Sequence, residues 1–489
     1  MRKSLTALAL ILSVTGGAAF AADITVGMQL EPPNLDPTGG AAAAIDEVVY
    51  ANVFEGLTRF GPDGSVLPGL AESWEIAPDG LSWVFTLREG VTFHDGLPLT
   101  AEDVAFSFER AMAEDSTNAQ KQLFEGINSV NVIDDRTVEI GLDTPKGALL
   151  WNLAWGDAVI VSPASAETNA TDPVGTGPFR FERWVQGDQV ELLRNEEYWG
   201  EPAALDGVTF KFISDPTAAF AAMMAGDIDA FPLFPAPENL AQFEADPRFQ
   251  VLVGSTEGET ILAMNNSRAP FDDIRVRQAV AHAIDRSAII DGAMFGYGTP
   301  IGSHFAPHHP AYVDLTGMSA YDPELAKALL AEAGLPDGFG TTLALPPPSY
   351  ARRGGEIVAS QLREIGIEAE IINVEWAQWL EQVFKGKDYG MTIVSHTEPL
   401  DIGIYARDDY YFGAHDPVMQ ALMTGLEPMT GAEDRDAVLK AMQQRVAENQ
   451  TAAFLFQWAK TGVADARIKG LWENAPTQAN DMSAVYWEE

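Results

Sequence analysis

The chain has 489 residues and is strongly acidic, with 71 Asp and Glu side chains against 30 Lys and Arg and a formal charge of −41. Hydrophobic residues make up 46% of the sequence, which excludes a disordered chain, and the length indicates about three domains. The large negative charge argues against nucleic acid or an anionic membrane surface as the main partner. Because the chain contains no cysteine, disulfides, thiolate nucleophiles and thiolate metal sites are excluded too.

The N-terminal segment has the pattern of a secretory signal peptide. Two basic residues, Arg2 and Lys3, are followed by an apolar run over 5–14 and by small residues at 19–21. Polar residues and glycines interrupt the end of this run, so it is too short for a membrane anchor. A lipoprotein carries its lipid on a cysteine, which this chain lacks. We therefore expect a cleaved signal peptide over 1–21 and a mature protein that is free in the periplasm of a Gram-negative bacterium.

Strand patterns dominate several parts of the N-terminal half. Residues 81–93 alternate hydrophobic and polar side chains, with Trp83 and Phe85 on one face, which predicts a hairpin-like β segment. Two further runs, 179–184 and 189–193, flank a glycine-containing turn and predict an antiparallel pair. The sheet structure of this half is therefore expected to be mixed rather than purely parallel.

The segment from 341 to 395 predicts alternating strands and helices. Its hydrophobic period and its breakers give a β-α-β-α-β run with elements over 341–345, 351–365, 367–374, 375–385 and 391–394. In parallel units of this kind, ligands bind at the carboxyl ends of the strands. The candidate binding loops are therefore 346–350, the corner at 375–376, and 395–401.

Two helices have clear start signals but indicate no chemistry. Asp322 is expected to cap a helix that begins at Pro323, and Asp272-Asp273 to open another. The expected apolar face of the first consists of Leu325, Ala328 and Leu329. The expected core residues of the second are Val276, Ala279, Val280, Ala283 and Ile284.

The sequence displays no catalytic signature. The motifs G-x-S-x-G, G-x-x-x-x-G-K-[ST] and H-E-x-x-H are absent, and we assign no catalytic residue. His304, His308 and His309 lie close together and invite a metal site, but Pro307 and Pro310 place them in a loop and no neighbour completes a ligand set. We therefore interpret them as surface loop histidines and expect neither a metal nor a cofactor.

Several stretches resemble the peptide-type (family 5) extracytoplasmic solute-binding proteins of ABC importers, a group that includes dipeptide, oligopeptide and nickel binders. The matching segments occur in family order over nearly the whole mature chain. They include 31–37 (EPPNLDP), 67–74 (LPGLAESW), 87–96 (LREGVTFHDG), 100–104 (TAEDV), 175–179 (GTGPF) and 275–279 (RVRQA).

The resemblance implies an α/β fold of the bilobal periplasmic binding protein type: type II, large, with an extra domain, mixed sheets and a ligand cleft between two lobes. Domain I would be discontinuous, domain II would be the extra lobe, and domain III would be the second ligand-binding lobe. The implied boundaries are 22–55 with 171–266 and 466–489 for domain I, 56–170 for domain II, and 267–465 for domain III. Ligand would bind between domains I and III, and a hinge motion would close the cleft.

The resemblance also implies candidate ligand contacts. In dipeptide-binding relatives, an aspartate after the last of these strands holds the ligand ammonium. Asp401 is the better match for that residue and Glu398 a rival, because a carboxylate there can form charge-assisted hydrogen bonds. The relatives' arginine for a ligand carboxylate has no counterpart in 345–350, so recognition of a free peptide C-terminus is in question.

Aromatic and polar side chains supply the other candidates. Trp376 either contacts ligand with its indole face or packs in the core. His396, Asn34, Trp155 and Tyr405 are candidates because their loops are expected to face the cleft.

The leading hypothesis is a substrate-binding component of an ABC transporter that captures a short peptide or another amine-bearing compound. It would be a monomer and deliver its ligand to the membrane permease subunits. The same role for an opine, oligosaccharide or metal chelate stays open, as does a chemosensory or chaperone-like role. A secreted hydrolase would need an acid, base or nucleophile cluster that the sequence does not display.

Overall fold

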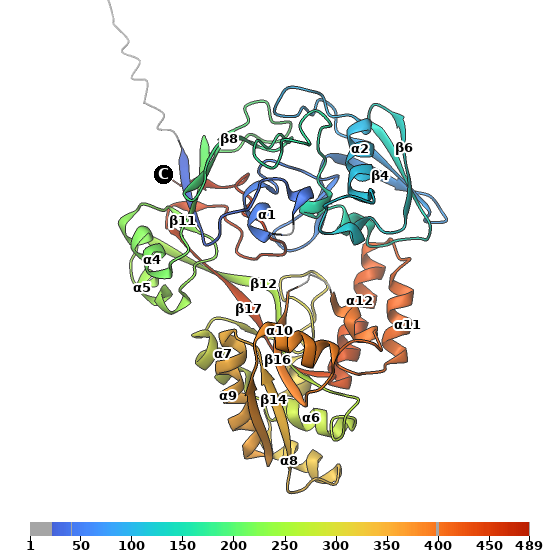
Figure 1. Ribbon diagram of the computed structural model, residues 1–489, viewed down its shortest axis with the longest axis vertical. Coiled ribbons are helices and arrows are strands. Elements are labelled where there is room, and N and C mark those ends of the chain that lie inside the picture. Colours follow the sequence, from blue (N-terminus) through green and yellow to red (C-terminus); the bar gives the residue numbers. More distant parts are fainter. Residues whose placement is uncertain (1–21, 41, 398–400, 489) are drawn as a thin grey trace, which may run out of the picture.

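The computed structural model describes residues 22–40, 42–397 and 401–488, which form two lobes connected by a pair of long strands (Figure 1). The predicted signal peptide, 1–21, and the candidate Glu398 lie outside the described residues. Within the described ranges, no helix combines the length and the apolar character needed to cross a membrane.

One mixed sheet extends through both lobes. In spatial order its strands are β15 (Ile367–Asn373), β14 (Phe339–Leu345), β16 (Met391–His396), β12 (Phe249–Met264), β17 (Ala452–Asp465), β11 (Ala230–Phe231), β1 (Asp23–Met28), β10 (Gly207–Phe212), β9 (Gln189–Arg194) and β8 (Phe179–Val185). The short β13 (Thr299–Pro300) pairs with β17. β14 lies parallel to β15 and β16, and β1 lies parallel to β10 and β11. β8 and β9 form the predicted antiparallel pair. The expected mixed α/β bilobal fold is confirmed.

β12 and β17 connect the lobes (Figure 1). They pair antiparallel, but their register shifts between Ser255 and Glu259. Ser255 is opposite Ala459 and Glu259 is opposite Gln457, so residues 256–258 of β12 lie beside the single residue 458 of β17. The connection between the lobes is therefore a two-stranded ribbon with a bulge in its middle.

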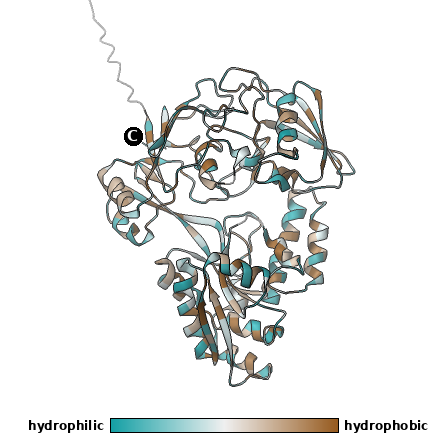
Figure 2. Ribbon diagram, viewed as in Figure 1, coloured by the Kyte–Doolittle hydropathy of each residue, from teal (hydrophilic) through white to brown (hydrophobic). Residues whose placement is uncertain are grey.

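The lobe at the bottom of Figure 1, here called the lower lobe, contains the predicted β-α-β-α-β run, and the other lobe is called the upper lobe. It consists of β14, α9 (Ser349–Glu364), β15, α10 (Trp376–Trp379) with a π-helical continuation η6 (Leu380–Lys385), and β16. Figure 2 shows hydrophobic residues along the strands of this lobe and more hydrophilic ones on the helices around them. The run brings the candidate loops after β14 and β16 to one end of the sheet, since both strands are parallel.

Three more helices complete the core of this lobe: α6 (Ile274–His282), α7 (Arg286–Met294) and α8 (Pro323–Glu332). Asp273 and Asp322 cap α6 and α8 as predicted. The expected face of α8 is wrong by one position: Ala326 and Leu330 are buried, whereas Leu325 is 41% exposed. The buried stripe is therefore the neighbouring one on the helix, and α8 packs on α6.

The upper lobe carries a second, antiparallel sheet of β4 (Ala71–Ile76), β5 (Ser82–Leu87), β7 (Thr137–Leu142) and β6 (Ile127–Asp134), covered by α2 (Ala101–Met112). Trp83, Phe85 and Leu87 are buried on one face of β5, as the alternation predicts. The hairpin predicted over 81–93 is wrong, because β5 pairs with β4 and β7 instead of with the residues that follow Gly90.

A buried carboxylate fixes the inner part of the upper lobe. Glu55 accepts hydrogen bonds from the Thr176 hydroxyl, the Tyr198 phenol and the Trp199 indole, each at 2.8 Å. Burial raises the pKa of Glu55, although these three hydrogen bonds oppose the shift. The three donors come from segments far from Glu55 in sequence, so the carboxylate ties them together.

α11 (Pro417–Leu426) and α12 (Ala432–Asn449) form a hairpin that extends from the lower lobe to the upper one (Figure 1). The Gly147 amide donates a hydrogen bond of 2.7 Å to the Glu427 carbonyl at the tip of this hairpin. The remaining α-helices and strands of the described residues are α1 (Ala43–Val49), β2 (Thr58–Phe60), β3 (Val66–Pro68), α3 (Leu149–Asn152), α4 (Pro216–Ala225), α5 (Leu240–Glu244), β18 (Ile468–Lys469) and β19 (Tyr486–Trp487). The exact domain boundaries stay a prediction.

Candidate functional site

A cavity of about 700 Å³ lies between the lobes, beside the α11–α12 hairpin. Trp74, Leu150 and Trp151 line it from the upper lobe. Asp401 and Ile404 line it from the lower lobe. A concave, largely apolar space with few polar groups is typical of a small-molecule site, and Asp401 places a predicted binding residue at its wall.

Asp401 forms a cluster with two histidines. Its Oδ1 lies 2.6 Å from Nε2 of His304, and its Oδ2 lies 3.3 Å from Nδ1 of His396. Asp401 begins the η7 turn (Asp401–Ala406), and His396 is the last residue of β16. His304 comes from the loop after β13, which the fold carries to the same place. Each carboxylate oxygen of Asp401 therefore has an imidazole partner.

Burial opposes ionisation of Asp401, but the charges and hydrogen bonds of His304 and His396 outweigh it and hold the pKa of Asp401 well below its usual range. The exposed fraction of the Asp401 side chain is only 14%. Asp401 is therefore an ionised carboxylate in a nearly dry setting, where a charge interacts more strongly than it does in water.

Two phenols complete this cluster. The Tyr405 hydroxyl lies 3.1 Å from Nδ1 of His304, and the Tyr411 hydroxyl lies 3.1 Å from Nε2 of His396. Burial, followed by the charge of Asp401, raises the pKa of Tyr405 well above its ordinary value. Both phenols are protonated at neutral pH, and each fixes the ring nitrogen that points away from Asp401.

A second histidine–carboxylate pair lies at the bulge in β12. Nε2 of His308 is 2.6 Å from Oε1 of Glu257, and its Nδ1 is 2.7 Å from the Ser255 hydroxyl. Glu259, two residues further along β12, is 3% exposed. Buried carboxylates thus lie within the bulge, at Glu257, and directly after it, at Glu259.

The other predicted site residues have different settings. Trp376 is 41% exposed, so the core-packing alternative is wrong, and it is Trp379 that is buried. Tyr405 and His396 are buried in the Asp401 cluster. Asn34 is half-buried and accepts a hydrogen bond from the Asp36 amide within a local turn.

Trp155 is partly buried and packs against Trp151 and Phe60, with ring centroids 5.3 and 6.3 Å apart. Trp151 lines the cavity.

The interpretation of His304, His308 and His309 as surface loop histidines is wrong. The side chains of His304 and His308 are 1% and 2% exposed, and burial lowers the pKa of His309 to about 4. His308 contacts the Glu257 carboxylate of β12, and His304 contacts the Asp401 carboxylate. Pro307 and Pro310 predict a loop, but they do not predict that its residues are buried.

Sequence reasoning also missed Glu257, Glu259 and Tyr411. The two glutamates lie in β12 in the segment TEGETI, where alternation of acidic and small residues reads as a solvated strand. Their burial depends on pairing with β16 and β17, which the local pattern does not contain.

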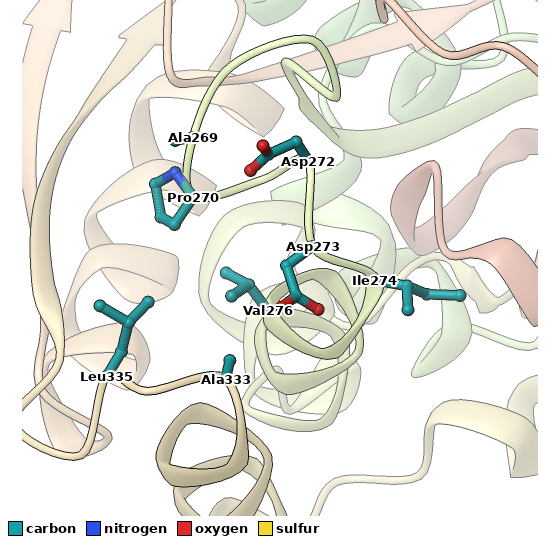
Figure 3. Close-up of a pocket in the computed structure, with 8 residues that line it drawn as sticks. All are labelled: Ala269, Pro270, Asp272, Asp273, Ile274, Val276, Ala333 and Leu335. Carbon is teal, nitrogen blue, oxygen red and sulfur yellow. The ribbon is translucent and has the colours of Figure 1, made fainter.

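A second cavity, of about 620 Å³, lies between the start of α6 and the residues after α8 (Figure 3). Figure 1 places α8 at the tip of the lower lobe, far from the upper one. Asp273 lines this cavity, but its carboxylate accepts from the Arg275 amide at 2.9 Å and caps α6. This carboxylate therefore serves the helix.

Comparison with known proteins agrees with the architecture. Residues 65–407 match the family described as bacterial extracellular solute-binding proteins, family 5 middle. The chain is 33% identical over 388 residues to heme-binding protein A of Haemophilus influenzae, covering 72% of this chain and 71% of that protein. It is also 33% identical over 390 residues to a glutathione-binding protein of Salmonella typhi, covering 78% and 75%.

Among solved structures, HbpA2 from Haemophilus parasuis superposes with a TM-score of 0.87 at 25% identity, covering 96% of this chain and all of that chain. The fold, the family match and the relatives agree, and the chain therefore belongs to family 5 of the bacterial extracellular solute-binding proteins, the substrate-binding components of ABC importers.

Proposed function

We propose that the protein captures a short peptide or another amine-bearing solute in the periplasm and delivers it to the permease subunits of an ABC importer. The observation that carries the choice of solute is the gathering of Glu257, Glu259 and Asp401 around the junction of the lobes. Such a group of carboxylates favours a cationic ligand over an anionic one, because a ligand ammonium gains charge-assisted hydrogen bonds there.

The partners of these carboxylates support the same choice. Glu257 and Asp401 pair with imidazoles, which carry a full positive charge only when protonated. A ligand ammonium would add a further positive hydrogen-bond donor beside these carboxylates. The similarity to a protein named for binding glutathione supports a short peptide as the solute.

Recognition of a free carboxylate has less support. Arg352, the nearest arginine to the loop after β14, binds the Glu375 carboxylate at 3.0 Å and approaches the Val374 carbonyl at 3.4 Å. It is occupied in joining α9 to the start of α10. We therefore place the solute's amine, rather than its carboxylate, at the centre of recognition.

The location follows from the N-terminal pattern. A cleaved leader over 1–21 and the absence of cysteine support a periplasmic protein without a lipid anchor. We propose that it meets the permease as a freely diffusing monomer.

Mass spectrometry of the small molecules that co-purify with the mature chain tests the proposal. The identified compound is then titrated in a thermal-shift assay, where stabilisation should increase with free ligand as RT ln(1 + [L]/Kd). Stabilisation by amine-bearing peptides supports the proposal. Stabilisation by a sugar or an opine, with none by a peptide panel, contradicts the solute class while leaving the transport role intact.

A further inference from the structure

The cluster around Asp401 has the composition of a metal site. Among the described residues, His304, His396 and Asp401 each offer one donor atom, and these atoms all lie within 4.8 Å of one another. They come from three separate segments: the loop after β13, the end of β16 and the start of η7. Two imidazoles and one carboxylate are a recurring ligand set for divalent transition metals.

The second layer of contacts strengthens this interpretation. In metal sites, a histidine ligand usually holds its other ring nitrogen in a hydrogen bond that fixes the ring's orientation. Here Tyr405 does this for His304 and Tyr411 does it for His396, both at 3.1 Å. A structural contact that only neutralises Asp401 would need one imidazole, whereas this arrangement orients two rings toward the same carboxylate.

A second carboxylate lies on the same face of the sheet as His396. Glu259 is directly opposite His396 in the β12–β16 pairing, and residues opposite each other in such a pair point to the same face, with Cβ atoms about 5 Å apart. Asp401 and Glu259 therefore place two carboxylates beside these imidazoles in a buried region. Carboxylate and imidazole donors gathered in one buried place are the groups from which proteins build transition-metal sites.

We propose that His304, His396 and Asp401 bind one divalent transition-metal ion of the zinc or nickel class. Imidazole donors suit these ions better than they suit Mg²⁺ or Ca²⁺, which prefer oxygen. Because Asp401 also lines the cavity between the lobes, the remaining coordination positions lie near the space that a solute would enter. The proposal goes beyond solute capture, since an ammonium needs the carboxylate but not the two imidazoles.

Isothermal titration of the tag-free, EDTA-treated mature chain with ZnCl₂ tests this proposal. We expect one Zn²⁺ per chain, with no competition from a large excess of Mg²⁺. His304→Gln and His396→Gln should each weaken zinc binding by more than about 100-fold, because loss of a second-layer partner alone costs about 10- to 100-fold. Tyr405→Phe, which keeps every ligand, should cost about tenfold.

His415→Gln is the matched control. His415 is 66% exposed and pairs with Asp408 at 2.7 Å, so it is a histidine–carboxylate pair without a second imidazole. Its zinc isotherm should equal that of the unsubstituted chain.

Two outcomes would overturn the proposal. One is the absence of stoichiometric zinc binding to the unsubstituted chain, which would leave the cluster as a hydrogen-bonded set of protonated histidines around Asp401. The other is binding that persists in both His304→Gln and His396→Gln while circular dichroism shows them folded. Neither result depends on whether a peptide binds, so failure here and failure of the proposed solute class are distinguishable.

Discussion

The two lobes each bury a carboxylate, and they satisfy it in opposite ways. In the upper lobe, Glu55 accepts from a hydroxyl, a phenol and an indole, and its pKa is raised by burial. In the lower lobe, Asp401 lies between two imidazoles, and its pKa is lowered despite burial. The neutral donors around Glu55 have fixed protonation, whereas the partners of Asp401 can change charge or bind an ion.

The two environments point to a structural role for Glu55 and a binding role for Asp401. Glu55 has the environment of a group that holds three segments together and is shielded from exchange with solutes. Asp401 has an ionised carboxylate at the wall of a cavity and partners with metal-binding chemistry. Changes at Glu55 should therefore appear mainly in stability, and changes at Asp401 mainly in binding.

The largest effect is expected for Glu55→Ala. This change removes the acceptor of three donors, and each unsatisfied buried donor costs about 1–3 kcal/mol, so the free energy of unfolding should decrease by about 3 kcal/mol or more. Urea unfolding followed by tryptophan fluorescence measures it. Glu89→Ala is the control, since that side chain is 86% exposed and should have little effect. Equal stability of the two variants would remove the structural role of Glu55.

Asp401→Asn should weaken binding of a cationic solute by tenfold or more. A hydrogen bond to a charged group contributes about 1.5–3 kcal/mol, and the amide keeps the shape but not the charge. Calorimetry with the co-purified solute measures the affinity, and Asp408→Asn, at an exposed pair, is the control. Unchanged affinity would move the contact to Glu398 or elsewhere and would weaken the contrast with Glu55.

Trp376→Ala should lower solute affinity by about fivefold, because an aromatic contact contributes about 1 kcal/mol. Its effect on unfolding should stay below about 0.5 kcal/mol, since the side chain is 41% exposed. Tyr321→Ala provides the comparison, as that ring is 46% exposed and begins the segment before α8. If both variants bind alike, Trp376 does not touch the solute.

The smallest effect concerns pH. Because burial raises the pKa of Glu55, the folded state holds this proton more tightly than the unfolded chain does. The stability that Glu55 contributes should therefore rise as the pH falls through its folded pKa toward the unfolded value of about 4.3. Urea unfolding measures the free energy of unfolding of the unsubstituted chain and of Glu55→Gln at pH 7 and at pH 5. The unsubstituted chain should gain stability relative to Glu55→Gln when the pH is lowered from 7 to 5. A shift in the opposite direction would contradict the raised pKa.

Local signals predicted much of the lower lobe. The β-α-β-α-β run was predictable because hydrophobic period and glycine stops act within a few residues, and the helix caps Asp273 and Asp322 of α6 and α8 were predictable for the same reason. The π-helical turn η6 (Leu380–Lys385) was not, since it has no local composition signal. The partners of β5 were not readable either, because strand pairing depends on residues far along the chain.

The site was predicted in part for the same reason. His396 ends β16 and Asp401 begins the turn that comes next, so a rule about strand ends finds both. His304 is 97 residues away from Asp401, and only the tertiary fold brings its ring to the carboxylate. The prolines around 307–310 predicted a loop correctly, but not that its residues are buried.

The bulge in the β12–β17 ribbon has a mechanical consequence. A continuous ladder resists bending because its hydrogen bonds couple the two strands, and this coupling is interrupted between Ser255 and Glu259. At the interruption, an added Cβ on Gly258 would lie 3.1 Å from the Trp458 side chain. This close approach favours glycine, which has no side chain, at position 258. The ribbon should therefore bend most easily next to Glu257 and His308. A small bend there would first change the distance between the Glu257 carboxylate and the His308 imidazole.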